Sequence, residues 1–314
     1  MKAAQYSVYG GPDVLALKDV EKPEPRAGEC LVSVAGAGLN PVDAKLRSGA
    51  LDGLFPLSFP VIPGWDVSGI VAAVGPEVDQ TWLGKKVFAY TRFDDVAQNG
   101  TCAQFCSVPA SFLAQTPESL DLSEAASVAL VALTAYQSLV EKAQIAAGQS
   151  ALIIAGGGAV GHYAIQLAKA AGAFVVTTAS PGDHEALRAK GADHCVSYRD
   201  SDWARQVAAY APHGFDVILD GVGAETLDQC YALLSSTGTL IGLNDPPLAE
   251  KIGPKAAAVR LFSRPEGSQL AQIASLIETG ALKLDTMTML PLSDVAKGHA
   301  LLDEGHKGKI VLVP

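Results

Sequence analysis

The stretch that decides the fold is Ala151–Ser180, ALIIAGGGAVGHYAIQLAKAAGAFVVTTAS. An apolar run typical of a buried strand leads into a glycine-rich turn, a helical pattern and a second apolar run, all within about 30 residues. Three of its glycines have the spacing G-x-G-x-x-G, which provides a tight turn, room for a pyrophosphate beside the backbone, and close packing of helix on strand. The N–H groups at the start of the helix then point at the phosphates. We therefore predict a dinucleotide-binding site formed by Gly156, Gly158, Ala159, Val160 and Gly161.

The end of the second apolar run indicates which dinucleotide binds. An NAD site normally places an acidic residue there to bind the ribose 2′-hydroxyl, whereas an NADP site avoids that charge. This run ends in Thr177–Ser180, TTAS, so we predict NADPH, with NADH the less favoured cofactor. Asp183 follows shortly afterwards. A small turn could bring its carboxylate back to the site, but we expect it to cap the next helix, a position that favours Asp.

The pattern of elements along the chain divides it in two. Up to about residue 122, short alternating runs separated by Gly and Pro predict strands and turns, and the remainder alternates between helices and short strands. Such alternation predicts βαβ units and a parallel sheet, so the fold class is α/β. The first helix is expected near Ser123–Lys142. The strands are expected at Ala151–Ala155, Phe174–Thr178, Cys195–Tyr198, Asp216–Asp220, Thr239–Leu243 and Ala256–Phe262.

Composition excludes several classes of function. A chain of 314 residues with 49% hydrophobic content and a formal net charge of −10 lacks the basic character that nucleic acids or anionic membranes require. We find no targeting segment and no apolar run long enough to cross a bilayer, so we expect a soluble, cytoplasmic protein. The five cysteines are scattered and odd in number, which predicts free thiols. Cys102 and Cys106 would lie about 13 Å apart on one strand and could not chelate one ion.

The whole chain resembles the medium-chain dehydrogenase/reductases, specifically the zinc-independent quinone oxidoreductase branch. This resemblance implies a GroES-like β-rich catalytic domain of residues 1–122, completed by residues 266–314, and a Rossmann domain of residues 123–265. It also implies a homodimer that pairs through the strand Ala256–Phe262. The motifs that carry it are AGAGLNPVDAKLRSG (35–49), PVIPGWDVSGIVAAVG (60–75), GKKVFAY (84–90), ALTAYQSL (132–139), GGGAVGHYAIQLAKAAGA (156–173), GADHCVSYR (191–199), FDVILDGVG (215–223) and GKIVLVP (308–314).

The resemblance also predicts that no metal is bound. The catalytic zinc ligands of zinc-dependent relatives match Asn40, Trp65 and Leu130 here, and these residues do not form a zinc ligand set. The region of the structural zinc lobe (residues 88–105) contains a single cysteine. For the 2′-phosphate of NADPH, the resemblance implies Ser180, Tyr198 and the adjacent Arg199. A family Lys is replaced by His184, whose effect is open and which we expect to be a solvated surface residue.

By the same resemblance, Asn40 and Thr134 should lie beside the nicotinamide, with Asp43 on the same segment as Asn40. We expect Asp43 to form a salt bridge with Arg47, with water or proton delivery as the alternative. Trp65 either stacks on a planar substrate or packs in the core.

Together with Phe55, Trp65 would line an apolar substrate pocket. A metal-free site favours a quinone acceptor, because delocalisation stabilises the product anion. Reduction of enones and a non-catalytic NADPH-binding role remain alternatives.

Overall fold

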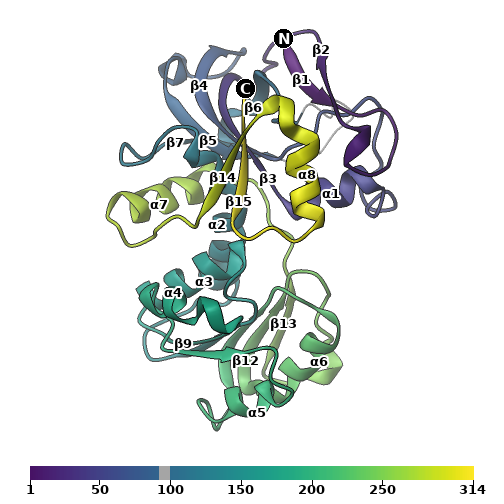
Figure 1. Cartoon of the computed structure of the whole chain (residues 1–314). Coiled ribbons are helices and arrows are strands. Elements are labelled where there is room, and N and C mark those ends of the chain that lie inside the picture. The colour runs from purple at the N-terminus through teal and green to yellow at the C-terminus, as the bar shows by residue number, and fades with distance from the viewer. Residues whose placement is uncertain (92–99) are drawn as a thin grey trace. The chain divides into compact units, whose positions relative to one another are not determined.

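The structure is a computed structural model that describes residues 1–91 and 100–314 (Figure 1). The chain forms two compact units. The first consists of Met1–Leu130, Arg264–Thr279 and Leu284–Pro314, and the second of Val131–Ser263 and Gly280–Lys283. The first unit thus extends further along the chain than residue 122. Within the described residues, no helix is long and apolar enough to cross a membrane.

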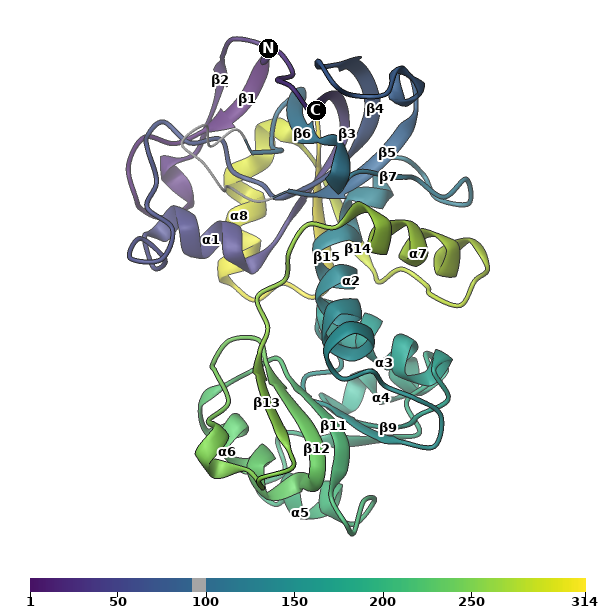
Figure 2. The ribbon, with the colours of Figure 1, turned by 180° about the vertical axis from the view of Figure 1, so that it is seen from behind.

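The second unit is built on a sheet of six described strands in the order β10-β9-β8-β11-β12-β13. Every pair in it is parallel, and Figure 2 shows β11, β12 and β13 side by side. In chain order this arrangement is 3-2-1-4-5-6, the Rossmann order, which confirms the predicted fold class. The strands are β8 (Ser150–Ile153), β9 (Phe174–Ala179), β10 (His194–Ser197), β11 (Phe215–Asp220), β12 (Leu234–Gly242) and β13 (Ala257–Arg260).

The connecting helices of this unit are α3 (Ala159–Ala170), α4 (His184–Ala189), α5 (Trp203–Ala208) and α6 (Ala224–Leu233). Every residue of α3 from Gly161 to Ala168 is buried, so the helix is covered on all sides over this stretch. The short segment Gly280–Lys283 belongs to the same unit and contacts α3. His162 Nε2 lies 2.7 Å from the carbonyl oxygen of Lys283, and Gln166 Oε1 accepts the N–H of Lys283 at 2.8 Å.

The first unit is β-rich. Its main described sheet has the order β14-β15-β3-β4-β5-β7, and β6 also pairs with β3. The strand β15 at the end of the chain pairs antiparallel with β3, with Ile310 opposite Leu39. The strands are β1 (Lys2–Gln5), β2 (Ala16–Asp19), β3 (Glu29–Leu39), β4 (Asp66–Val74), β5 (Lys86–Tyr90), β6 (Phe105–Pro109), β7 (Ala114–Gln115), β14 (Met287–Pro291) and β15 (Lys309–Val313). Its helices include α1 (Pro41–Ser48), α7 (Gly267–Glu278) and α8 (Val295–Asp303).

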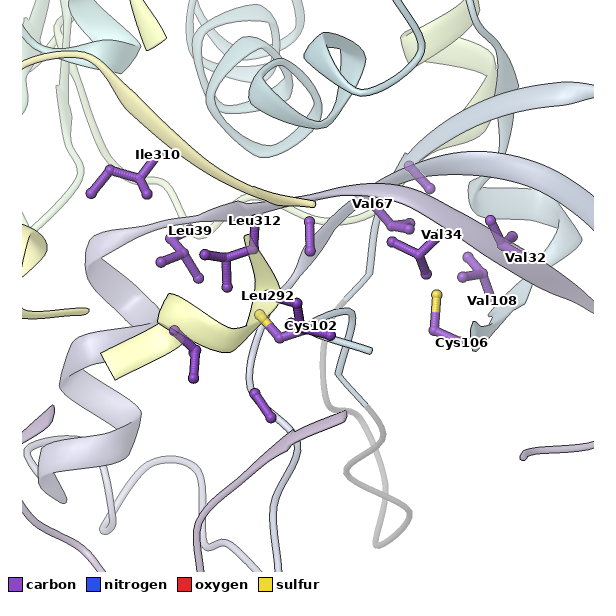
Figure 3. Packing of buried hydrophobic residues seen from close by; sticks show 14 of the residues in the cluster. Val32, Val34, Leu39, Val67, Cys102, Cys106, Val108, Leu292, Ile310 and Leu312 are labelled. Atoms are coloured by element: carbon purple, nitrogen blue, oxygen red, sulfur yellow. The ribbon is translucent and has the colours of Figure 1, made fainter. Parts of the chain in front are cut away.

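Apolar side chains from distant parts of the chain form the core of the first unit (Figure 3). Val34 of β3, Val67 of β4 and Leu312 of β15 belong to one buried cluster. Cys102 and Cys106 lie in the same cluster as free, buried thiols, in agreement with the prediction that the cysteines are free. The expected strand through both cysteines was wrong in part, because β6 begins only at Phe105.

The helix expected near Ser123–Lys142 is three successive elements. A 3-10 segment at Glu124–Ser127 is followed by α2 (Ala129–Tyr136) and a π-helical turn at Gln137–Lys142. The backbone of the 3-10 segment passes so close to β3 that a Cβ on Gly38 would lie 2.1 Å from the carbonyl oxygen of Ala126. The glycine in β3 therefore lets the 3-10 segment lie against the sheet of the first unit.

Candidate functional site

The glycine turn between β8 and α3 has the geometry that the sequence motif predicts. A Cβ on Gly156 would lie 2.0 Å from Thr177 Oγ1, and a Cβ on Gly161 would lie 2.4 Å from the carbonyl oxygen of Ala155. Ala155 itself has a positive φ of 59°, a conformation that L-residues rarely adopt. Gly158 is the N-cap of α3, so the first N–H groups of that helix face outward at the turn. The turn can therefore accept an anionic group against its backbone.

Polar side chains gather where the neighbouring strands β9 and β10 end. Ser180 follows β9, and its Oγ lies 3.0 Å from the hydroxyl oxygen of Tyr198, which follows β10. The hydrogen bond with Ser180, reinforced by the adjacent Arg199, lowers the pKa of the exposed Tyr198 hydroxyl. The structure thus brings together two of the residues predicted to bind the 2′-phosphate, with the Arg199 guanidinium 5.9 Å from the Tyr198 ring.

Asp183 does not have its expected role. It stands at the N-cap position of α4, yet within the described residues its side chain forms no cap hydrogen bond to that helix. The 3-10 turn Pro181–Asp183 directs the side chain toward the glycine turn, where a Cβ on Gly157 would lie 3.1 Å from Asp183 Oδ2. The capping prediction was therefore wrong, and a carboxylate lies beside the predicted phosphate site.

His184 also differs from expectation. Its Nε2 lies 3.3 Å from the carbonyl oxygen of Ala179, in a partly buried hydrogen bond at the end of β9. The imidazole is thus held against the strand end rather than fully solvated.

In the first unit, Asn40 is part of a buried polar cluster. Lys309 Nζ donates to Asn40 Oδ1 at 2.6 Å, to Asp66 Oδ2 at 3.0 Å and to the carbonyl oxygen of Leu39 at 3.1 Å. Asn40 Nδ2 donates to the same Asp66 oxygen at 3.0 Å. Asp66 Oδ1 accepts the N–H of Leu130, near the start of α2, at 2.7 Å. Asn40, Asp66 and Lys309 are only 1%, 0% and 5% exposed, so both ends of the Asn40 amide are occupied inside the unit.

Asp43 lies next to this cluster and is also buried. Its Oδ2 accepts the N–H of Asn40 at 2.8 Å and its Oδ1 that of Gly64 at 3.2 Å. Burial raises the pKa of the Asp43 carboxyl to about 7, because desolvation outweighs the backbone hydrogen bonds and the nearby Asp66 charge also disfavours ionisation.

The expected salt bridge between Asp43 and Arg47 was wrong. Arg47 Nη2 instead pairs with Asp303 of α8 at 2.7 Å, and Arg47 Nε donates to the carbonyl oxygen of Gly10. Arg47 therefore links α1 to α8. Asp43 instead accepts the backbone N–H groups of Asn40 and Gly64. Sequence neighbours on one helix do not necessarily pair when tertiary partners are available.

The two aromatic residues predicted to line the substrate pocket contact each other. Phe55 meets Trp65 edge-on with ring centroids 6.1 Å apart, and Trp65 stacks on Tyr90 at 5.8 Å. Trp65 is 2% exposed, so the structure supports its packing role. Thr134 lies on α2 in the second unit and is 8% exposed, so its juxtaposition with Asn40 stays a prediction.

Sequence reasoning missed Asp66 and Lys309. Asp66 directly follows Trp65 in the motif GWDVSG, and Lys309 opens the last apolar strand. A charged residue at the start of a strand ordinarily indicates a solvated strand end. The only available signal was that both lie within conspicuous motifs.

The chain is similar to known oxidoreductases over its whole length. Residues 26–118 match the model of the alcohol dehydrogenase GroES-like domain, and residues 190–312 match the model of a zinc-binding dehydrogenase family. The whole chain is 33% identical to the NADPH-dependent alkenal/one oxidoreductase, chloroplastic, of Arabidopsis thaliana, covering 80% of that protein. It is 31% identical to the quinone-oxidoreductase homolog, chloroplastic, of Spinacia oleracea, covering 98% of it. The chain belongs to the medium-chain dehydrogenase/reductase superfamily, in its quinone oxidoreductase branch.

Similarity to a solved structure agrees with this membership. All of this medium-chain dehydrogenase/reductase superposes on 99% of the quinone oxidoreductase from Coxiella burnetii with a TM-score of 0.87 and 31% sequence identity. The predicted family resemblance is therefore confirmed. In this family member the glycine turn and the Ser180–Tyr198 pair lie in the Rossmann unit, and the Asn40 cluster lies in the GroES-like unit.

Proposed function

We propose that this protein is an NADPH-dependent reductase that transfers hydride to a quinone. The observation that carries the proposal is the sterically restricted glycine turn with the Ser180–Tyr198 pair on the adjoining strand ends. The proposal is also supported by the relatives, one named as an NADPH-dependent oxidoreductase and another as a quinone-oxidoreductase homolog.

The residues present fit NADPH. At Gly156 and Gly161, a Cβ would clash with Thr177 or with backbone, so the turn keeps the open backbone surface that a pyrophosphate needs. Ser180, Tyr198 and Arg199 offer hydrogen-bond donors and a positive charge to a 2′-phosphate. When bound, NADPH supplies the hydride.

The residues present do not fit a catalytic zinc ion, and we propose a metal-free reaction. The matching positions hold Asn40, Trp65 and Leu130, and the Asn40 oxygen already receives the Lys309 ammonium at 2.6 Å. A positive charge at that distance opposes binding of a second cation. Among the described residues, no group of three or more His, Cys, Asp or Glu side chains could hold a metal. Residues 92–99, within the region that matches the structural zinc lobe, lie outside the described part.

The protein's own residues then have defined tasks. We propose, from the family resemblance, that Asn40 and Thr134 lie beside the nicotinamide. Asp43, with a pKa of about 7, helps to hold the segment that carries Asn40 through two backbone hydrogen bonds. Solvent supplies the proton that completes reduction. A quinone suits such a site because its reduced anion is delocalised and needs no Lewis acid.

A second candidate function is reduction of the double bond of an enone or alkenal. The observation that favours it is the 33% identity over the whole chain to a relative named as an alkenal/one oxidoreductase. Both reactions use the same cofactor site. They differ in whether a ring carbonyl system or an activated alkene carbon receives the hydride.

The test is NADPH oxidation by chelator-treated protein, with an ortho-quinone and an enone assayed separately and NADH run beside NADPH. One-electron cycling of the quinone is suppressed. Turnover of the quinone with NADPH is expected, and faster turnover of the enone would favour the second candidate. Tight NADPH binding with no turnover of either acceptor would favour a non-catalytic NADPH-binding protein.

We also propose a homodimer and a cytoplasmic location. The strand β13 lies at the edge of the described Rossmann sheet, and Phe262 just beyond it is 44% exposed, so the edge can pair with a second copy. The five free cysteines suit a reducing compartment. The net charge of −10 supports a small-molecule substrate rather than a nucleic acid or membrane partner. Light scattering and imaging of a fluorescent fusion test the two proposals.

A further inference from the structure

The ammonium group of Lys309 sits in a cage of three oxygen atoms. Its partners are the carbonyl oxygen of Leu39, Asn40 Oδ1 and Asp66 Oδ2, at 3.1, 2.6 and 3.0 Å. An ammonium has three N–H donors and no acceptor, so this geometry uses all of them. With 5% exposure and no donor left over, the group cannot also bind a substrate.

The cage joins segments that are far apart in the chain. Leu39 ends β3, Asp66 begins β4 and Lys309 begins β15, and the second Asp66 oxygen accepts the N–H of Leu130 near the start of α2. Burying an ion pair has a large desolvation cost, which is offset only when further hydrogen bonds satisfy the remaining lone pairs and protons. Here both oxygens of Asp66 and all three protons of the ammonium have hydrogen-bond partners, so this condition is met.

The same contacts determine the orientation of the Asn40 amide. The Lys309 ammonium is only a donor, and an ionised Asp66 is only an acceptor. Asn40 must therefore present Oδ1 to Lys309 and Nδ2 to Asp66. A flipped amide would place its NH₂ group against the ammonium and its oxygen against the carboxylate. The ion pair thus allows a single orientation at this position.

We propose that Lys309 is the resident cation of the Asn40–Asp66 cluster and a positioning residue for hydride transfer, acting through Asn40 and Asp66. The positioning part rests on the function proposed above. A positive charge is needed at this place to hold the two oxygen-bearing side chains together, and the chain supplies it as an ammonium on its last strand. The competing explanation is that the ion pair only stabilises the fold.

Chemical rescue distinguishes these explanations. Lys309→Ala removes the side chain beyond Cβ, and n-propylammonium has the same length as the atoms removed. Lys309→Met is the matched control, because it removes the charge but fills the space and leaves no room for the amine. Lys18→Ala, at an exposed strand residue, controls for loss of charge alone. The readouts are kcat and KM for the quinone with NADPH, the Kd of NADPH by fluorescence titration, and the thermal midpoint.

For Lys309→Ala and Lys309→Met we expect kcat to fall on the order of 10- to 100-fold. This is the range found when a hydrogen-bond partner that orients a metal ligand is removed, and Lys309 orients Asn40 in the same indirect way. The Kd of NADPH should change far less than kcat, because the residues predicted to bind its phosphates are in the other unit. Propylammonium should restore kcat in Lys309→Ala but not in Lys309→Met. Loss of thermal stability with unchanged kcat, or equal responses of the two variants to the amine, would overturn the positioning role.

If Lys309→Ala does not fold, the double variant Asp66→Asn/Lys309→Met removes both charges of the ion pair. A low kcat in a folded double variant supports the proposal, and a wild-type kcat overturns it. If the wild type turns over no acceptor, the proposed function fails and the positioning role fails with it. The resident-cation part is then decided by the thermal midpoint. Recovery of Lys309→Ala with propylammonium supports it, and lack of recovery overturns it.

Discussion

Replacing Asp43 with Asn should change how the stability of the first unit depends on pH. Burial raises the pKa of this carboxyl from 3.8 to about 7. Between those pH values the native state binds a proton that the unfolded state has released. Stability contributed by this group is therefore complete below about pH 4 and is lost as pH rises toward 7, at about 1.4 kcal/mol per pH unit. The total loss is about 4 kcal/mol.

His299 should oppose this dependence. It is a fully buried residue of α8, and its pKa is lowered from 6.5 to about 3, chiefly by burial and further by the Arg47 charge, with Asp303 opposing. In this interval the unfolded state binds a proton that the native state does not, so stability rises with pH by about 1.4 kcal/mol per unit. The two contributions should cancel between about pH 4 and about pH 6.5.

The assay is urea unfolding of the wild type, Asp43→Asn and His299→Leu at several values between about pH 5 and about pH 6.5. Both residues belong to the first unit, so they affect the same transition. We expect a flat wild-type profile, a rising one for Asp43→Asn and a falling one for His299→Leu. Asn also loses one of the two backbone hydrogen bonds at a cost of about 1–3 kcal/mol, but that loss is independent of pH. A flat profile for Asp43→Asn would refute the reasoning.

Three further predictions concern single contacts. Asp183→Asn should raise the NADPH-to-NADH ratio of kcat/KM by about three- to tenfold, because it neutralises a carboxylate whose charge acts on Tyr198 of the predicted 2′-phosphate site; a lower ratio would contradict this. Gly161→Ala should weaken NADPH binding at least about tenfold, since its Cβ would lie 2.4 Å from a backbone oxygen. In the same fluorescence titration the matched control Gly253→Ala, whose Cβ would make only an ordinary contact with Ser236 at 3.6 Å, should bind normally. Asp303→Ala should destabilise the protein to urea by about 2–3 kcal/mol, because it leaves the buried Arg47 guanidinium without its carboxylate; a loss below about 0.5 kcal/mol would show that the pair is dispensable.

The Rossmann unit was predictable because its signals are local. The strand, the glycine turn and the helix follow one another within Ala151–Ser180, so steric requirements at Gly156 and Gly161 are visible in the sequence. Alternation of helix and strand then determined the parallel sheet. Five of its strands lie within two residues of their expected bounds, and β12 begins at Leu234, five residues before the expected Thr239. The family resemblance pointed to Ser180 and Tyr198, which do meet at neighbouring strand ends.

Tertiary structure alone decided the polar contacts of the first unit. Lys309 and Asn40 are 269 residues apart in the chain, and Arg47 and Asp303 are 256 apart. The sequence shows the charges but not their partners, because pairing depends on which strands become neighbours and how deeply each side chain is buried. The surroundings of Asp183 were also not visible in the sequence, although they depend on nearby residues. The 3-10 turn that contains it places its carboxylate toward the glycine turn and not on the end of α4. The sequence by itself determined the fold and the cofactor motif; long-range packing, through the desolvation it imposes, decided which charged groups are paired, neutral or held in one orientation.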